Sequence, residues 1–219
     1  MICLITPTGD RPDAFALCQQ YMLAQDYSGD VRWIIVDDGV TATPVTFERE
    51  GWEVDVLRLE PMPRSQARNL LVGMGHVAPG GRVAIIEDDD AYAPEYLSHI
   101  SDWLDSADLV GERFTRYYNV RTGRGQQMKN RDHASLCATA MKGEATEDFC
   151  QLLVKLSSAL DMTLWRDFKG SKYLSDTFYV TGIKGMPGRK GVGVGHREEF
   201  GLPMSLRHWI GERAALYGY

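Results

Sequence analysis

The chain has 219 residues, of which 44% are hydrophobic and 25% are charged, and its formal net charge is −6. This composition is typical of a soluble globular protein that is long enough for one large core. The acidic balance argues against a protein that coats nucleic acid through bulk electrostatics. We therefore expect a single domain that spans residues 1–219.

The N-terminal residues and the cysteines bear on where the protein works. The opening segment "MICLITPTGDRP" has no basic region and reaches Pro and Gly after a short apolar run, so we expect no signal peptide. No apolar run approaches the roughly 20 residues that span a bilayer. The absence of C-x-x-C spacing argues against a zinc site and a disulfide framework for the four cysteines, which are Cys3, Cys18, Cys137 and Cys150. We expect a reducing, cytoplasmic location.

Strand and helix patterns alternate through the first half of the chain. The apolar run at 2–6 predicts a buried strand, and turn signals separate it from apolar residues at helical spacing between 14 and 22. Further strands are expected at 31–36, 52–59 and 82–86, and helices at 67–74 and after Pro94. This alternation predicts right-handed crossovers and a mixed, mostly parallel central sheet with helices on both faces.

The second half has a less regular pattern. We expect strands at 107–112, 114–120, 134–141 and 177–184, one or two helices within 147–168, and a C-terminal helix at 206–216. Between the last strand and the last helix lies a Gly-rich loop, residues 185–201, with no hydrophobic periodicity. Long loops of this kind are usually functional.

Acidic residues follow two of the expected core strands. Asp37 and Asp38 end the strand at 31–36, and four acids at 87–90 end the strand at 82–86. In open parallel sheets, ligands bind outside the carboxyl ends of the strands. Crowded carboxylates there indicate a divalent cation such as Mg²⁺ or Mn²⁺. The alternative is that the acids complement the helix that begins at Pro94, although one acid would be enough for that.

Four motifs occur in an order that resembles a known family. They are "ITPTGDRP", "WIIVDDG", "SQARNLLV" and "VAIIEDDDAYAPEYL", and they cover about the first 110 residues. This order and spacing resemble the family 2 glycosyltransferases with the GT-A (Rossmann-like) fold. The resemblance implies a nucleotide-sugar donor, for which we expect a UDP-sugar, a divalent cation, Mn²⁺ or Mg²⁺, and an acceptor nucleophile. It also implies a nucleotide-sugar-binding half, 1–110, and an acceptor-binding half, 111–219.

The resemblance implies which residues lie beside the nucleotide. They are Thr6, Pro7, Thr8, Arg11, Asp37, Asp38, Arg68 and Asp88. One of the acids that end the second strand normally accepts a hydrogen bond from the base, and the arginine of "ARN" normally packs on the base or bonds to it. The alternative for Arg68 is a salt bridge to a nearby strand-end acid.

The acids at 87–90 match the D-x-D motif of the family. Counted back from Pro94, the motif is Glu87, Asp88 and Asp89, with Asp89 as the metal ligand and Asp88 near the ribose. Glu87 stands where the family has Asp, so the sequence leaves open which oxygens touch the metal, and Asp90 is a further candidate.

The Gly-rich loop contributes a second group of candidates. His196 resembles the C-terminal histidine that completes the metal shell in many GT-A enzymes, while the alternative is an ordinary histidine. Lys184, Arg189 and Lys190 are suited to folding over a diphosphate, in which case they bind the donor. The alternative for these basic residues is an exposed, solvated loop.

The family uses an acid at the start of a helix as the base that activates the acceptor. Asp161 in "SSALDMTLWRDF" is our first candidate, although Leu160 stands where the family often has an acid. Asp176 is the second candidate. The third is the pair Glu147 and Asp148, which we interpret as acids at a helix N-terminus.

The segment 113–131 is basic and aromatic. Its six basic residues, without an intervening acid, are Arg113, Arg116, Arg121, Arg124, Lys129 and Arg131. Together with Phe114, Tyr117 and Tyr118 they predict an anionic acceptor, such as a phosphorylated glycan, a lipid-linked phosphate or a nucleic acid carrying a modified DNA base. The alternative is a solvated face.

Three functions are consistent with these features. The first is a metal-dependent, inverting glycosyltransferase. The second is a sugar nucleotidyltransferase, which would require a glycine-rich first loop, whereas "PTGDRP" has a single glycine. The third is a non-catalytic module that binds a nucleotide-sugar or nucleic acid with the same fold.

Overall fold

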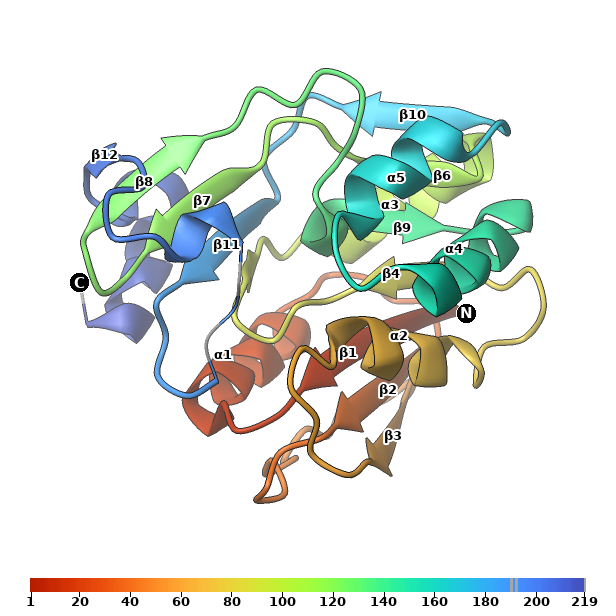
Figure 1. Ribbon diagram of the computed structural model, residues 1–219, viewed down its shortest axis with the longest axis horizontal. Coiled ribbons are helices and arrows are strands. Elements are labelled where there is room, and N and C mark those ends of the chain that lie inside the picture. Colours follow the sequence, from red (N-terminus) through yellow and green to blue (C-terminus); the bar gives the residue numbers. More distant parts are fainter. Residues whose placement is uncertain (190, 192, 219) are drawn as a thin grey trace.

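The first half of the chain folds into the expected series of strands and helices (Figure 1). The computed structural model describes residues 1–189, 191 and 193–218. The elements of the first half are β1 (Ile2–Thr8), α1 (Pro12–Leu23), β2 (Val31–Asp37), β3 (Trp52–Arg58), α2 (Gln66–Met74), β4 (Val83–Ile85), β5 (Ala91–Tyr92) and α3 (Tyr96–Ser106). Helix α1 begins at Pro12, whose fixed φ and missing N–H suit the first helical position.

The second half differs more from the expectation. Its elements are β6 (Leu109–Glu112), β7 (Arg116–Asn119), β8 (Arg124–Gln127), η1 (Leu136–Ala138), β9 (Thr139–Met141), α4 (Glu144–Lys155), α5 (Leu160–Asp167), β10 (Lys172–Ser175), β11 (Val180–Lys184), η2 (Val194–His196), β12 (Leu202–Pro203), α6 (Arg207–Ile210) and η3 (Gly211–Tyr217). The segment expected as one strand at 134–141 is a 3-10 turn followed by a short strand. The expected C-terminal helix is one α-helical turn that continues as 3-10 helix.

The main sheet is mixed and mostly parallel, as predicted. Its order is β10-β6-β9-β4-β1-β2-β3, and β9 runs antiparallel to both of its neighbours. Ile5 of β1 is paired with Ile34 of β2 and with Ile85 of β4. This register places the carboxyl ends of β1, β2 and β4 side by side, so that Thr8 at the end of β1 lies level with Asp88.

A second, five-stranded sheet lies next to the main one in the order β12-β8-β7-β11-β5 (Figure 1). Its strand β5 directly follows the acidic run and pairs with β11, Ala91 opposite Thr181. This pairing carries Lys184, the last residue of β11, to the acids at the end of β4.

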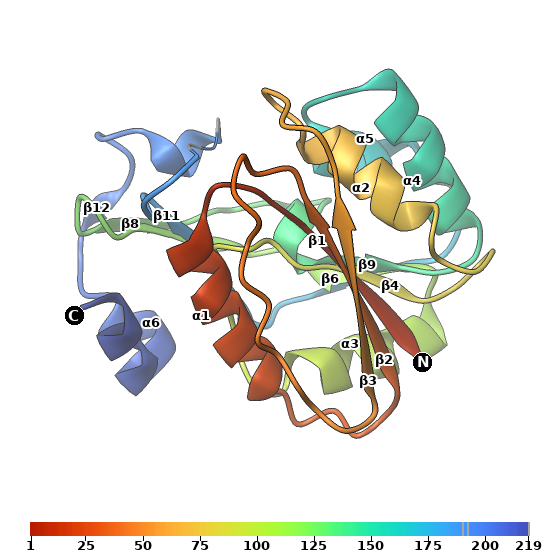
Figure 2. The ribbon, with the colours of Figure 1, turned by 90° about the horizontal axis from the view of Figure 1, so that it is seen from below.

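Two hydrophobic clusters cover the two faces of the main sheet. Phe15 of α1 and Leu104 of α3 are buried against one face, and Leu70 of α2, Phe149 of α4 and Leu164 of α5 against the other. Figure 2 shows α1 and α3 on one side of the strands and α2, α4 and α5 on the other. Burying each of these large side chains contributes roughly 1.5 to 3 kcal/mol. Both clusters pack on one sheet, so the chain forms a single domain.

In the described part of the chain, every helix is too short or too polar to cross a bilayer. The four cysteines are free thiols in this structure, and Cys3, Cys18 and Cys137 are buried.

Candidate functional site

A cleft with a volume of about 920 Å³ opens at the carboxyl ends of β1, β2 and β4. Most of the candidate residues, from both halves of the chain, line this cleft. The candidates that line it are Pro7, Thr8, Arg11, Asp38, Asp88, Asp89, Asp161, Lys184, Arg189 and His196. Among the residues that the structure describes, seven further candidates do not line the cleft: Thr6, Asp37, Arg68, Asp90, Glu147, Asp148 and Asp176.

Asp88 lies where β1 and β4 meet. Its carboxylate accepts hydrogen bonds from Thr8 Oγ1 at 2.8 Å and from Arg11 Nη1 at 2.7 Å. Burial raises the pKa of Asp88 to about 6; the charge of Arg11 opposes this shift, and the negative charge of Asp89 adds to it. Neighbouring Thr6 does not reach the cleft, because its hydroxyl is buried and accepts a hydrogen bond from Trp33 Nε1 at 2.9 Å.

Asp89 is a carboxylate held between two cations. It pairs with Arg11, and Lys184 Nζ lies 3.5 Å from its Oδ1. Burial alone would raise the pKa of Asp89, but the charges of Lys184 and Arg11 hold it below its usual range. Asp89 therefore presents a negative charge at the cleft at neutral pH.

Asp90 points away from the cleft. Its Oδ1 accepts hydrogen bonds from the backbone N–H of Ile183 at 2.8 Å and from Lys184 Nζ at 2.9 Å, and burial raises its pKa. Lys184 was expected to fold over a diphosphate from a loop. It instead ends the buried strand β11, where its ammonium group also lies 3.4 Å from Glu87. Asp90 and Lys184 thus form a buried pair beneath the cleft.

The acids at 87–90 offer ligand atoms of the kind that bind a divalent cation. Among the described residues, potential ligand atoms of Glu87, Asp90 and Cys137 lie within 4.8 Å of one another, and the ammonium group of Lys184 contacts both acids of that group. Asp89, Glu87 and His196 line the cleft, but their ligand atoms do not form such a group, and Asp89 also pairs with Arg11. Carboxylate and imidazole groups suit Mg²⁺, Mn²⁺ and related ions, so the fit lies in the chemistry of these donors.

The protonation state of His196 supports this fit. Burial, together with the charge of Lys184, lowers the pKa of His196 to about 4, so the imidazole is neutral at pH 7, as a metal ligand must be.

The two acids that end β2 have different surroundings. Asp37 is buried; it accepts hydrogen bonds from the N–H groups of Gly39 at 2.8 Å and Thr43 at 2.7 Å and pairs with Arg58. It therefore fixes the turn after β2. Asp38 faces the cleft and pairs with Arg68 and Arg189 at 3.1 and 2.7 Å. Arg68 thus forms a salt bridge to a strand-end acid, which was the alternative to binding the base.

Hydrogen bonds hold Asp38 in its ionised form. Burial would raise the pKa of Asp38, but hydrogen bonds from Ser65 and Asn69 and the charge of Arg189 bring it below its usual range. Its partner Arg189 belongs to the Gly-rich loop, whose Lys190 lies outside the described residues.

Asp161 and Asp176, the two candidates for the base, lie in different places. Asp161 is in the first turn of α5 and lines the cleft, after Ala159 with a left-handed φ of 55°. Asp176 follows β10 at the edge of the main sheet, its side chain is 69% exposed, and it pairs with Arg113 at 2.7 Å. The structure places Asp161, and not Asp176, in the cleft that Asp38, Asp88 and Asp89 also line.

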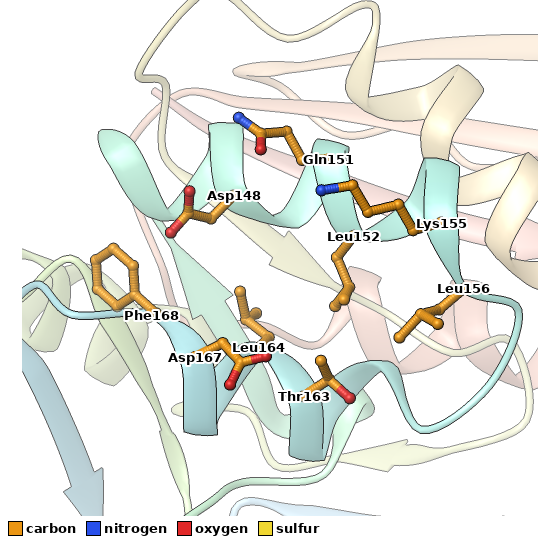
Figure 3. Close-up of a pocket in the computed structure, with 9 residues that line it drawn as sticks. All are labelled: Asp148, Gln151, Leu152, Lys155, Leu156, Thr163, Leu164, Asp167 and Phe168. Atoms are coloured by element: carbon orange, nitrogen blue, oxygen red, sulfur yellow. The ribbon is translucent and has the colours of Figure 1, made fainter.

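Asp148 lies in a separate, smaller hollow. This hollow, of about 340 Å³, is lined by residues of α4 and α5. Figure 3 shows Asp148 on α4 and Asp167 on α5 at the same hollow, with Leu152 and Leu164 between the helices. Glu147 lies in the first turn of α4, where its charge complements the helix N-terminus. Neither acid lines the larger cleft among the described residues.

The basic segment 113–131 is not one continuous basic surface. Arg116 packs on the ring of Phe178 at 3.7 Å, and Arg121 pairs with Glu198 at 3.4 Å. Arg124 donates hydrogen bonds to the carbonyl of Gly201. Lys129 and Arg131 are exposed, and of the described residues in this segment only Tyr117 lines the cleft.

Sequence reasoning missed one wall of the cleft, which consists of Pro61, Met62, Pro63 and Arg64. It continues into Ser65, Gln66 and Asn69 of the motif "SQARNLLV", from which only Arg68 was taken as a candidate. A signal for it was present in "PMPRS", where two prolines connect a strand to a helix at the same edge of the sheet. Sequence analysis also missed Tyr117, because nothing in its segment distinguishes the tyrosine that faces the cleft from its neighbour Tyr118, which donates a hydrogen bond to the carbonyl of Met204.

Comparison with known proteins identifies the fold. No protein-family model and no curated protein matches the chain. Among solved structures, S. aureus TarS 1–349 superimposes with a TM-score of 0.63 at 17% identity, covering 83% of this chain and 60% of that one. A longer S. aureus TarS gives 0.59 at 17% identity, with 83% and 36% covered. The mannosyltransferase PcManGT from Pyrobaculum calidifontis, in complex with GDP-Man and Mn²⁺, gives 0.58 at 15% identity, with 85% and 57% covered.

The chain therefore spans about 36% to 60% of the length of these three proteins. At these identities the likeness establishes the fold. The chain has the GT-A fold, with the cleft at the carboxyl ends of its parallel strands.

Proposed function

We propose that this chain is a metal-dependent glycosyltransferase that moves a sugar from a nucleotide-sugar donor to an acceptor hydroxyl, with inversion at the sugar carbon. One observation carries the proposal. A single cleft on a GT-A fold contains the buried acid Asp38, the paired acids Asp88 and Asp89, the neutral imidazole of His196 and, from the other half of the chain, Asp161.

The donor is assigned to the side of the cleft formed by β1, β2 and α2. Asp38 accepts a hydrogen bond from the base, and Asp88, held by Thr8, lies near the ribose. Arg11, which lines the cleft, is assigned to the diphosphate, whereas Lys184 is assigned to the buried acids Glu87 and Asp90. The mannosyltransferase complex with GDP-Man and Mn²⁺ supports a nucleotide-sugar donor. The sequence resemblance favours a UDP-sugar.

The divalent cation is assigned to Asp89 and His196, with Glu87 beside them. A bound cation there stabilises the negative charge that develops on the leaving nucleoside diphosphate. The complex of the mannosyltransferase with Mn²⁺ supports this assignment.

Transfer follows a single displacement. Asp161 accepts the proton of the acceptor hydroxyl, whose oxygen forms a bond to the anomeric carbon of the sugar. The bond between that carbon and the diphosphate oxygen breaks, and the nucleoside diphosphate leaves with the electron pair. The proposed acceptor is anionic, either a phosphorylated glycan or a modified DNA base, and the exposed Lys129 and Arg131 support this class.

Release of nucleoside diphosphate from a panel of UDP-, GDP-, CDP- and dTDP-sugars with Mn²⁺ tests this function, since transferases hydrolyse their donors slowly without an acceptor. We expect Asp161→Asn to lower turnover about 100-fold or more, because general bases contribute factors of that size, while nucleotide affinity stays unchanged. Asp102→Asn, an exposed acid on α3, is the matched control.

Two results would contradict the proposal. Nucleotide binding without any turnover would identify a binding module. Full turnover in Asp161→Asn, with loss of turnover in Asp176→Asn, would assign the base to Asp176.

A further inference from the structure

The acid assigned to the nucleobase is covered by the protein itself. The side chain of Asp38 has no exposed surface, whereas that of Arg189 is 30% exposed. Arg189 Nη1 donates to Asp38 Oδ1 at 2.7 Å and to Ser65 Oγ at 3.1 Å. Its Nη2 donates to Asp10 Oδ2 at 3.0 Å and to the backbone carbonyl of Asp38 at 3.0 Å. The guanidinium group thus joins residues that are 124 to 179 positions away along the chain.

The backbone at Gly188 and Arg189 packs against the backbone of Asp10, next to Asp38. Gly188 has a left-handed φ of 102°, and a Cβ there would lie 2.2 Å from the carbonyl oxygen of Asp10. The N–H of Arg189 donates to that carbonyl at 3.2 Å. A Cβ on Gly9 would in turn lie 2.6 Å from Asp38 Oδ1. Glycines at positions 9 and 188 let the backbone at Asp10, Asp38 and Arg189 approach closely enough for Arg189 to reach Asp38.

We propose that Arg189 is a latch: it closes the donor site by occupying the Asp38 carboxylate, and a nucleoside diphosphate binds only after Arg189 has left. This inference rests on the proposed function, because it needs Asp38 as the acceptor for the base. It differs from the sequence-based expectation, in which Arg189 binds the donor.

The contacts of Asp38 explain why the latch and the base exclude each other. Its Oδ2 accepts from Arg68 at 3.1 Å and from the N–H of Met62 at 3.3 Å, and Ser65 and Asn69 also donate to this carboxylate. With these partners in place, we assign the nucleobase to Oδ1. Arg189 holds that oxygen. Opening moves one partly exposed side chain and the backbone next to Gly188, while Arg68 remains paired with Asp38.

The latch predicts slow association of nucleotides. Because only the open fraction of molecules binds, the observed association rate constant is the intrinsic one multiplied by that fraction. Charge-assisted hydrogen bonds of this kind keep the open fraction on the order of one tenth or less. Removal of the latch raises the association rate constant by about the same factor.

Stopped-flow mixing of the full chain with mant-UDP and mant-GDP, each with Mn²⁺, tests the latch. We expect Arg189→Ala to raise the association rate constant on the order of tenfold. Gly188→Ala should have the same effect while keeping the arginine, because its Cβ prevents docking on Asp10. Arg197→Ala, an exposed arginine of the same loop, is the control and should match the native chain.

The outcomes separate this proposal from the proposed function. An association rate constant that is unchanged or lower in both variants overturns the latch and leaves the donor site intact. A faster dissociation with unchanged association identifies Arg189 as a ligand of the nucleotide and also overturns it. Binding of neither nucleotide by the native chain or the variants overturns the proposed function together with the latch.

Discussion

Asp37 and Asp38 are adjacent in sequence but have different roles in the structure. Asp37 accepts two backbone N–H groups and pairs with Arg58, so it belongs to the fold. Asp38 faces the cleft and pairs with two arginines that are each about 30% exposed. The sequence alone could not predict which of the two acids faces the cleft. That depends on the turn at 39–43, whose N–H groups donate to Asp37.

This difference predicts separable effects of the two isosteric variants. Asp37→Asn places an amide donor against a backbone N–H group, so we expect it to lower the free energy of unfolding by about 1 to 3 kcal/mol. Asp38→Asn should weaken nucleotide binding and change stability less, because its arginine partners can be hydrated. Urea unfolding and nucleotide titration of both variants measure these effects. The reverse pattern would assign the base to Asp37.

At the scale of elements, Glu112 connects the two sheets. It ends β6 of the main sheet and accepts hydrogen bonds from the N–H groups of Tyr179 and Val180 at 2.6 and 3.0 Å and from Thr177 Oγ1 at 3.0 Å. These residues lead into β11, the strand that ends at Lys184. Glu112 therefore helps to hold the buried cation beside the strand-end acids.

Glu112→Gln is expected to destabilise the chain by about 1 to 3 kcal/mol, because its amide donor would face a backbone N–H group. Burial raises the pKa of Glu112 above 4.5, although its hydrogen bonds oppose the shift. Between 4.5 and the raised pKa the folded chain holds a proton that the unfolded chain has released, so this group's contribution to stability falls as pH rises.

Urea unfolding of the native chain and of Glu112→Gln across this pH range measures both effects. Glu198→Gln, whose exposed ion pair with Arg121 contributes little, is the control. Equal stability and equal pH dependence in all three proteins would show that Glu112 does not join the sheets.

At the scale of the whole molecule, the first half was predicted well because its signals are local. Strands β2 and β4 are runs of mostly buried residues that stop at acids, Asp37 and Glu87, and the parallel register brings those ends together. That pattern predicts the mostly parallel sheet with its acids at one edge, while the resemblance of the four motifs implied the GT-A fold and the candidate residues that line the cleft.

The second half was predicted less well because its structure depends on distant contacts. Strands β5, β8, β10 and β12 have two to four residues each, too few for a recognisable alternation. Lys184 was assigned to a loop function, since only the pairing of β11 with β5 shows that it is buried under the acids. Long-range pairing of this kind leaves no local trace in the sequence.

The central claim is that the cleft binds a nucleoside diphosphate together with a divalent cation at Asp89. Thermal unfolding of the native chain with UDP, GDP, CDP or dTDP, with and without Mn²⁺, tests it most directly, and Asp89→Asn is the matched variant. A ligand at 100 times its Kd adds about 2.7 kcal/mol to the free energy of unfolding. We therefore predict that one nucleotide with Mn²⁺ raises the Tm of the native chain by roughly 5 to 10 °C. Asp89→Asn should lose the part of the shift that depends on Mn²⁺. A Tm that no nucleotide raises with Mn²⁺ present, or an equal shift in Asp89→Asn, would contradict the claim.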